Sequence, residues 1–123
     1  MQRTALVVED NPLNMELIEE LLLAKGWTVL KAYDVEEARQ VVAAGLPDLI
    51  FLDIQLPGQD GLSYAAQLRM EYGAKVPPLI AITAQAMKGD GDKILAAGFD
   101  YYLPKPFEFA QFYRIIDEAL NSR

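Results

Sequence analysis

The sequence contains no cysteine and no histidine, and these two absences exclude several classes of functional site. Without cysteine the chain has no disulfide framework, no thiolate zinc site and no cysteine nucleophile. Without histidine it has no imidazole base, no Ser-His-Asp triad and no histidine-ligated metal. Any chemistry must therefore depend on carboxylates, hydroxyls and lysine, together with a hard metal ion that oxygen ligands could hold.

Positive charge and long apolar runs are also scarce. The chain has 11 Lys and Arg against 18 Asp and Glu, a net charge of −7, which argues against binding to nucleic acid or to anionic membranes. The first apolar run, residues 5–8, is too short for a signal peptide or a membrane span and stops at Glu9. We therefore expect a cytoplasmic protein that binds neither nucleic acid nor membrane.

The 123 residues suit one domain, residues 1–123, and a hydrophobic content of 52% with 24% charged residues is typical of a globular chain. Strand-like and helix-like segments alternate five times. The strand-like segments are residues 5–8, 27–32, 49–52, 79–82 and 99–103, and the helix-like segments are residues 13–25, 34–44, 60–72, 87–97 and 106–120. This pattern predicts an α/β fold with a doubly wound parallel sheet, whose three wholly apolar strands are central.

Polar residues stand where four of these strands end. Glu9 and Asp10 follow the first strand, Asp53 the third, Thr83 the fourth and Lys105 the fifth. Each residue alone has an ordinary structural explanation as a helix cap, a turn residue or a solvated charge. The carboxyl ends of parallel strands lie along one edge of the sheet, where such folds bind ligands, so the fold should bring these side chains together.

Three carboxylates at one edge repel one another, by about 4 kcal/mol for two charges 4 Å apart at an effective dielectric of 20. Glu9, Asp10 and Asp53 therefore need a cation or raised pKa values. Lys105 offers one positive charge and a divalent ion offers two, and an all-oxygen site suits Mg²⁺. A hard metal, an aspartate, a lysine and a hydroxyl are the groups that phosphoryl transfer to an aspartate requires.

At this point the chain resembles the receiver domains of two-component response regulators over essentially its whole length. The matching segments are Val7-Val8-Glu9-Asp10-Asn11, Ile50-Phe51-Leu52-Asp53-Ile54-Gln55-Leu56-Pro57, Gly61, Ile82-Thr83-Ala84 and Lys105-Pro106. The resemblance implies a flavodoxin-like (βα)5 fold with strand order 2-1-3-4-5. Residues 84–90 also resemble the equivalent segment of single-domain cell-cycle receivers of the DivK type and of receivers in hybrid kinases.

The resemblance also implies roles for individual residues. Asp53 would accept the phosphoryl group, and Thr83 and Lys105 would contact it. The implied ligands of Mg²⁺ are Glu9, Asp10, Asp53 and the backbone carbonyl of Gln55. Glu9 stands where the family more often has Asp, a replacement that should preserve metal binding.

Further family features fall on neighbouring positions. Tyr102 occupies the position of an aromatic switch residue that turns inward when Thr83 moves. The bond between Lys105 and Pro106 lies where the family has a cis peptide. Gln55 and Gln85 occupy the two positions that tune dephosphorylation, and their neutral amides predict an intermediate or long phosphate lifetime.

Two helices carry predicted core stripes. The stripe of the first helix comprises Asn14, Leu17, Ile18, Leu21 and Leu22, and that of the last helix comprises Phe109, Phe112, Tyr113, Ile116 and Leu120. The first helix then has Leu23 on its far side and Leu13 and Met15 on its flanks. These residues fit either an ordinary surface or the face on which the family docks a kinase's phosphotransfer domain. Gly89 and Gly91 weaken the fourth helix, which belongs to the family's signalling face.

We predict a stand-alone receiver, not a turnover enzyme, which accepts a phosphoryl group from a sensor histidine kinase or a histidine phosphotransfer protein. It would act on a downstream protein target as a monomer or weak dimer. Two other functions lack residues that they need. A dehalogenase-type phosphatase needs a second Asp where this chain has Gln55, and a flavin carrier needs a Ser/Thr/Gly-rich phosphate loop, which does not follow Val8. The open alternative is a receiver-like docking module that is never phosphorylated.

Overall fold

The computed structural model describes residues 3–56, 60–83, 90–105 and 108–121. In this part of the chain strands and helices alternate, with a short 3-10 helix at Gly73–Lys75. The strands are β1 (Thr4–Val8), β2 (Thr28–Ala32), β3 (Leu49–Asp53), β4 (Leu79–Thr83) and β5 (Tyr101–Pro104). The helices are α1 (Pro12–Leu23), α2 (Val35–Ala44), α3 (Gly61–Tyr72), α4 (Asp90–Ala96) and α5 (Phe109–Asn121).

All five strands run parallel in one sheet, in the order β2-β1-β3-β4-β5. Leu6 of β1 lies opposite Leu30 of β2 on one side and Ile50 of β3 on the other. Every residue of β3 and β4 is buried, whereas the edge strands β2 and β5 are partly exposed. The predicted doubly wound fold and its strand order are therefore confirmed, with the wholly apolar strands in the centre.

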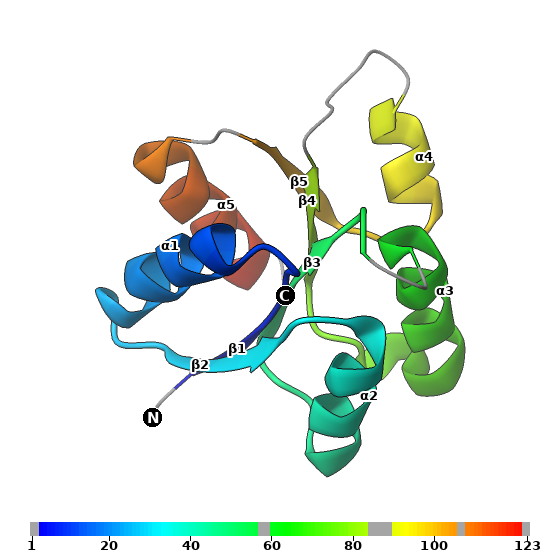
Figure 1. The fold of residues 1–123 in the computed structure, drawn as a ribbon. Helices are drawn as coiled ribbons and strands as arrows, with labels where there is room; N and C mark the ends of the chain where they lie inside the picture. Colours follow the sequence, from blue (N-terminus) through cyan, green and yellow to red (C-terminus); the bar gives the residue numbers. More distant parts are fainter. Residues whose placement is uncertain (1–2, 57–59, 84–89, 106–107, 122–123) are drawn as a thin grey trace.

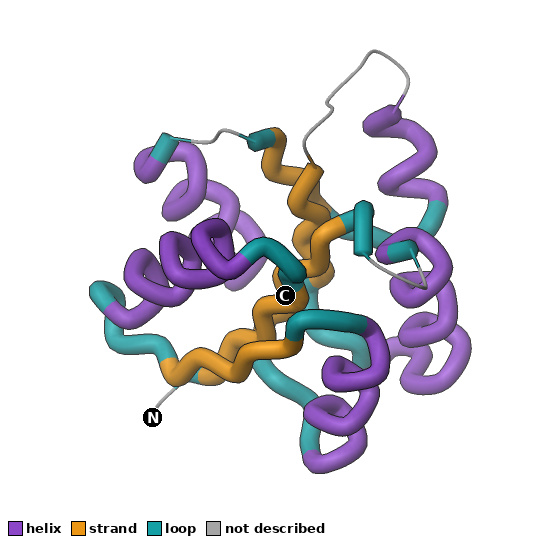
Figure 2. The backbone as a smooth tube through the Cα atoms, viewed as in Figure 1, coloured by secondary structure: helices purple, strands orange, loops and turns teal. Residues whose placement is uncertain are grey.

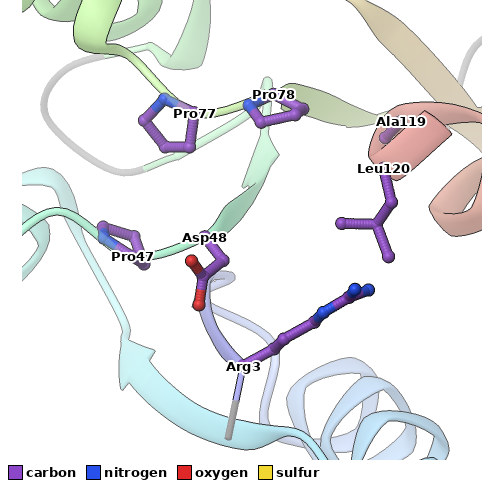
Figure 3. A pocket seen from close by; sticks show the side chains of 7 residues that line it. All are labelled: Arg3, Pro47, Asp48, Pro77, Pro78, Ala119 and Leu120. Carbon is purple, nitrogen blue, oxygen red and sulfur yellow. The ribbon is translucent and has the colours of Figure 1, made fainter. Parts of the chain in front are cut away.

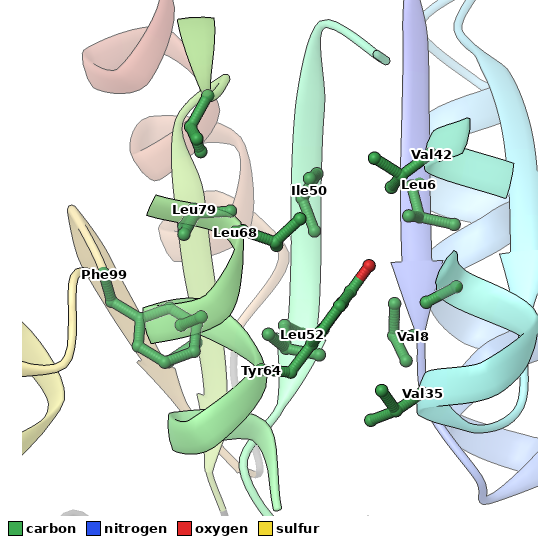
Figure 4. Packing of buried hydrophobic residues seen from close by; sticks show 14 of the residues in the cluster. Leu6, Val8, Val35, Val42, Ile50, Leu52, Tyr64, Leu68, Leu79 and Phe99 are labelled. Atoms are coloured by element: carbon green, nitrogen blue, oxygen red, sulfur yellow. The ribbon is translucent and has the colours of Figure 1, made fainter. Parts of the chain in front are cut away.

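Helices cover both faces of the sheet: α1 and α5 lie on one face, and α2, α3 and α4 on the other (Figures 1 and 2). Successive strand residues point to opposite faces, so Val7 packs in the layer of α1 and α5, and Val8 in the layer of α2 and α3. Figure 4 shows the second layer, where the ring of Tyr64 lies among aliphatic side chains from the strands and helices. None of the described helices combines the length and the apolar character of a membrane-spanning segment.

Three of the helices begin at a polar side chain that accepts hydrogen bonds from the first turn. Asn11 accepts from the backbone N–H of Leu13 at 2.9 Å and of Asn14 at 3.2 Å, ahead of α1. Asp34 caps α2, and Asp60 caps α3. Such caps satisfy backbone N–H groups that the first turn of a helix leaves unpaired. They therefore define the residue at which each of these three helices begins.

Two predictions about apolar residues of the helix stripes are wrong. Met15, expected on a flank of α1, is 1% exposed and belongs to the core, whereas Leu13 and Leu23 are exposed as expected. Phe109, expected in the core stripe of α5, is 56% exposed. It is the first residue of α5 and lies one turn before Phe112, whose ring stacks on Phe51 at 5.2 Å between centroids. The helical periodicity predicted which face of each helix is apolar, but it did not predict which residues of that face contact the sheet.

Arg69 of α3 joins three parts of the second layer. Its guanidinium donates to the carbonyl of Gly98 at 2.6 and 2.9 Å and to the carboxylate of Asp100 at 2.9 Å. The same Asp100 oxygen accepts the backbone N–H of Leu79 at 2.9 Å. Gly98 has φ 113°, and a Cβ there would lie 2.9 Å from Cγ of Arg69. The guanidinium thus fixes the connection from α4 to β5 against α3 and the start of β4.

Replacing Arg69 with Met should lower the free energy of unfolding by about 1–3 kcal/mol, because the change keeps the apolar stem but removes charged hydrogen bonds to the Gly98 carbonyl and the Asp100 carboxylate. Urea denaturation followed by circular dichroism measures the effect. Arg114→Met, at an exposed position of α5, is the matched control and should shift the value by less than about 0.5 kcal/mol. Equal effects of the two changes would contradict a structural role for Arg69.

Candidate functional site

The predicted site residues meet at the carboxyl edge of the sheet. Glu9 follows β1, Asp53 ends β3, Thr83 ends β4 and Lys105 follows β5. Backbone hydrogen bonds hold the strand ends in register: the N–H of Lys105 donates to the carbonyl of Thr83 at 2.7 Å, and that of Ile54 to the carbonyl of Ile82 at 3.1 Å. Residues separated by up to 96 positions in sequence are therefore held by the sheet itself.

Lys105 bridges two buried carboxylates. Its Nζ donates to Oε2 of Glu9 at 3.0 Å, to Oε1 of Glu9 at 3.3 Å and to Oδ2 of Asp53 at 3.2 Å. Glu9 is 0% exposed and Asp53 is 4% exposed. One ammonium therefore serves two carboxylates, which leaves negative charge in excess at the centre of the site.

The excess charge is larger because Asp10 lies beside this pair. One carboxylate oxygen from each of Glu9, Asp10 and Asp53 lies within 4.8 Å of the others. Asp10 is exposed, so the cluster opens to solvent on its side, and all donors are oxygens. This set fits a hard divalent cation such as Mg²⁺, which binds through a few carboxylates and retains several waters.

The ionisable groups show the electrostatic strain. Burial raises the pKa of Glu9, and the neighbouring Asp53 raises it further, while Lys105 only partly opposes the shift. Burial alone would lower the pKa of Lys105, but its hydrogen bond to Glu9 and the charges of Asp53 and Glu9 outweigh burial and raise it. The lysine is therefore firmly charged, and a proton or a cation near Glu9 relieves the same repulsion.

Asp53 is held at both of its oxygens. Its Oδ1 accepts the backbone N–H of Gln55 at 2.9 Å, while Oδ2 faces Lys105. The side chain of Gln55 is exposed. Gly61 packs beneath: a Cβ there would lie 2.9 Å from Cα of Ile54 and closer still to the carbonyl oxygen of Asp53. Only glycine lets α3 approach the end of β3 this closely.

The remaining predicted residues divide into those described and those outside the described ranges. Thr83 is 6% exposed, and Tyr102, on the edge strand β5, is 39% exposed. The predicted cis peptide before Pro106 and the predicted tuning position Gln85 lie outside the described residues. Their assigned roles stay predictions.

The sequence alone did not identify two contacts to Glu9 from the start of α1. The backbone N–H of Asn11 donates to Oε1 of Glu9 at 3.2 Å, and the side-chain amide of Asn14 donates to the same oxygen at 3.5 Å. Asn14 was assigned to the core stripe and is instead half-buried next to the site. The sequence did contain a signal for this contact: Asn14 is a polar residue in an otherwise apolar stripe, one turn after the capping residue Asn11.

A separate pocket of about 310 Å³ opens at the amino ends of the strands (Figure 3). Its charged lining residues are Arg3 and Asp48. The Asp48 carboxylate accepts the backbone N–H of Thr4 at 2.8 Å, a contact that ties β1 to the start of β3. A single carboxylate engaged in this way does not form a metal site, so the acidic cluster at the opposite edge remains the candidate.

Replacing Asp53 with Asn should stabilise the metal-free protein, because it removes one of three repelling carboxylates while Lys105 keeps Glu9 as its partner. We expect the free energy of unfolding in chelator to rise by about 1–2 kcal/mol, and the gain to shrink when MgCl₂ neutralises the wild-type cluster. Urea denaturation under both conditions tests this. Asp117→Asn makes the same charge change on exposed α5 and should have little effect. A destabilised Asp53→Asn would show that attraction to Lys105 outweighs the repulsion.

Comparisons with known proteins agree with this arrangement. Residues 5–117 match the family model of the response regulator receiver domain. The polar-differentiation response regulators DivK of Brucella anthropi and Brucella ovis are each 37% identical to this chain over 121 residues, which cover 98% of this chain and 98% of theirs.

Solved structures show the same fold. A putative response regulator from Chloroflexus aurantiacus superposes with a TM-score of 0.92 at 31% identity, covering 98% of this chain and 99% of the other. The receiver domain of the sensor histidine kinase PA1611 from Pseudomonas aeruginosa, with a magnesium ion coordinated in its active-site cleft, gives 0.88 at 35% identity, covering 98% and 99%. The chain belongs to the family of response regulator receiver domains of two-component signalling.

Proposed function

We propose that this receiver domain accepts a phosphoryl group on Asp53 in a Mg²⁺-dependent reaction and signals by changing a protein-binding face. The observation that carries the proposal is the position of the Asp53 carboxylate. It lies between the Gln55 N–H and the Lys105 ammonium, within 4.8 Å of the Glu9 and Asp10 carboxylates. A nucleophile, a cation and a divalent-ion site thus share one small space.

The residues of the site have different roles in phosphoryl transfer. A carboxylate oxygen of Asp53 forms the new P–O bond while the P–N bond of a donor phosphohistidine breaks, and the donor leaves as a neutral imidazole. Glu9, Asp10, Asp53 and the carbonyl of Gln55 would hold Mg²⁺, which supplies charge neutralisation for the phosphoryl oxygens. Lys105 then exchanges a carboxylate partner for a phosphoryl oxygen, and the Thr83 hydroxyl donates to another.

The donor is a sensor histidine kinase or a histidine phosphotransfer protein. Support comes from the relatives: one is named a response regulator and another is the receiver of a sensor histidine kinase with bound magnesium. Leu13 and Leu23 of α1, 77% and 54% exposed, give the helix apolar surface for such a donor. The protein modifies itself and transmits the result to a downstream protein, without turning over a separate substrate.

The output passes through Thr83 and Tyr102. Thr83 is buried at the end of β4, and the Tyr102 side chain stands exposed on the neighbouring edge strand β5. A phosphoryl group on Asp53 adds negative charge and acceptor oxygens that draw the Thr83 hydroxyl inward. The space that it leaves admits the Tyr102 ring, which changes the surface formed by β5 and its neighbouring helices.

Incubation with acetyl phosphate and MgCl₂ should add one phosphoryl group to the wild type, measured by intact mass. Asp53→Asn and chelator should each abolish the adduct, because one removes the acceptor and the other the metal. Asp117→Asn should behave as wild type. A wild type that stays unmodified would favour the alternative of a phosphorylation-independent docking module, and an adduct that persists on Asp53→Asn would place the acceptor elsewhere.

Phosphorylation should also protect Tyr102 from nitration by tetranitromethane, mapped by peptide mass spectrometry. Tyr33, 41% exposed against 39% for Tyr102, is an internal reference whose nitration should not change. Thr83→Ala should accept the phosphoryl group, but the nitration of its Tyr102 should no longer depend on phosphorylation, because the hydroxyl that moves is missing. In the wild type, equal nitration of Tyr102 with and without phosphorylation would exclude this output route.

A further inference from the structure

Glu9 is the most enclosed charged group of the site, and among the described residues few hydrogen-bond donors hold it. Its carboxylate, 0% exposed, accepts from Lys105 at both oxygens and from Asn11 and Asn14 at Oε1. Two of these four contacts come from one ammonium. A buried carboxylate with a flexible side chain keeps its orientation only while donors hold it.

The Lys105 contacts are the ones that metal binding weakens. A divalent cation among the three carboxylates repels the nearby ammonium, and phosphoryl transfer gives Lys105 a new acceptor. The other two donors to Glu9 are uncharged and lie at the start of α1. They are the backbone N–H of the capping residue Asn11, at 3.2 Å, and the side-chain amide of Asn14, at 3.5 Å. These neutral donors can hold Glu9 while the cation is bound.

We propose that Asn14 is a positioning residue, whose side-chain amide holds the Glu9 carboxylate in the orientation that serves the metal site. The inference rests on the proposed Mg²⁺ site and adds a residue to it. The local structure supports this role: the backbone N–H of Asn14 donates to the side chain of the capping residue Asn11 at 3.2 Å, which fixes Asn14 in the first turn of α1. The amide therefore projects from a rigid helix start, half-buried against the site.

The arrangement depends on glutamate at position 9. The contact between Asn14 and Glu9 is already long at 3.5 Å. An aspartate at position 9 would end one C–C bond earlier, about 1.5 Å, and could not both reach the amide and face the cluster. Asn14 should therefore matter when residue 9 is Glu and should not matter when it is Asp.

A double-mutant cycle tests this dependence. Mg²⁺ dissociation constants are measured by amide chemical shifts during MgCl₂ titration of wild type, Asn14→Ala, Glu9→Asp and the double variant. Asn14→Ala should weaken Mg²⁺ binding about 10-fold in the wild-type background, the size typical of an outer-shell partner, and should leave Glu9→Asp unchanged. Asn14→Leu, which keeps the volume without the donor, should match Asn14→Ala.

The outcomes separate the two proposals. Equal loss in both backgrounds, or no loss in the wild-type background, overturns the role of Asn14 while the Mg²⁺ site stands. A wild type that does not bind Mg²⁺ overturns both. Circular dichroism in chelator checks that Asn14→Ala is fully folded at the titration temperature, and a loss of Mg²⁺ binding that tracks an unfolded fraction would assign Asn14 a purely structural role, against the proposal.

Discussion

The confinement of three carboxylates and one ammonium at the carboxyl edge of a parallel sheet is the constraint on which the rest of the structure depends. Lys105 contacts both Glu9 and Asp53, whose side chains are almost wholly excluded from solvent. One positive charge cannot neutralise three negative ones, so the site retains an affinity for further positive charge. A divalent cation held by the three carboxylates would meet that demand.

The scaffold around these charges is rigid because it is built from the most buried parts of the chain. β3 and β4 are buried along their whole length, and each face of the sheet carries its own apolar layer. Gly61 brings α3 against the end of β3, and Asn11 fixes the start of α1 beside Glu9. The starts of these helices are thus packed against the ends of the strands. A small structural change at Asp53 therefore moves the neighbouring elements, because a closely packed interior deforms little.

The same architecture places a buried residue and an exposed one on neighbouring strands beside the site. Thr83 is enclosed at the end of β4, while Tyr102 stands on the edge strand, where a side chain has room to change position. Arg69 fixes the connection between α4 and β5 at its far end, through Gly98 and Asp100. In the proposed output route, a change that begins at Thr83 is therefore directed toward the ends of α4 and β5 that lie nearest the site.

The sequence by itself determined the elements and their order, because short apolar runs, capping residues and helix-ending glycines act locally. It also placed Glu9, Asp53, Thr83 and Lys105 at strand ends, which the parallel topology was bound to bring together. Only the tertiary structure decided which oxygen each donor reaches, that Asn14 turns to Glu9, and that Met15 is buried while Phe109 is exposed. These outcomes depend on how far each helix lies along the sheet, and that position is set by packing between segments distant in sequence, which local periodicity does not encode.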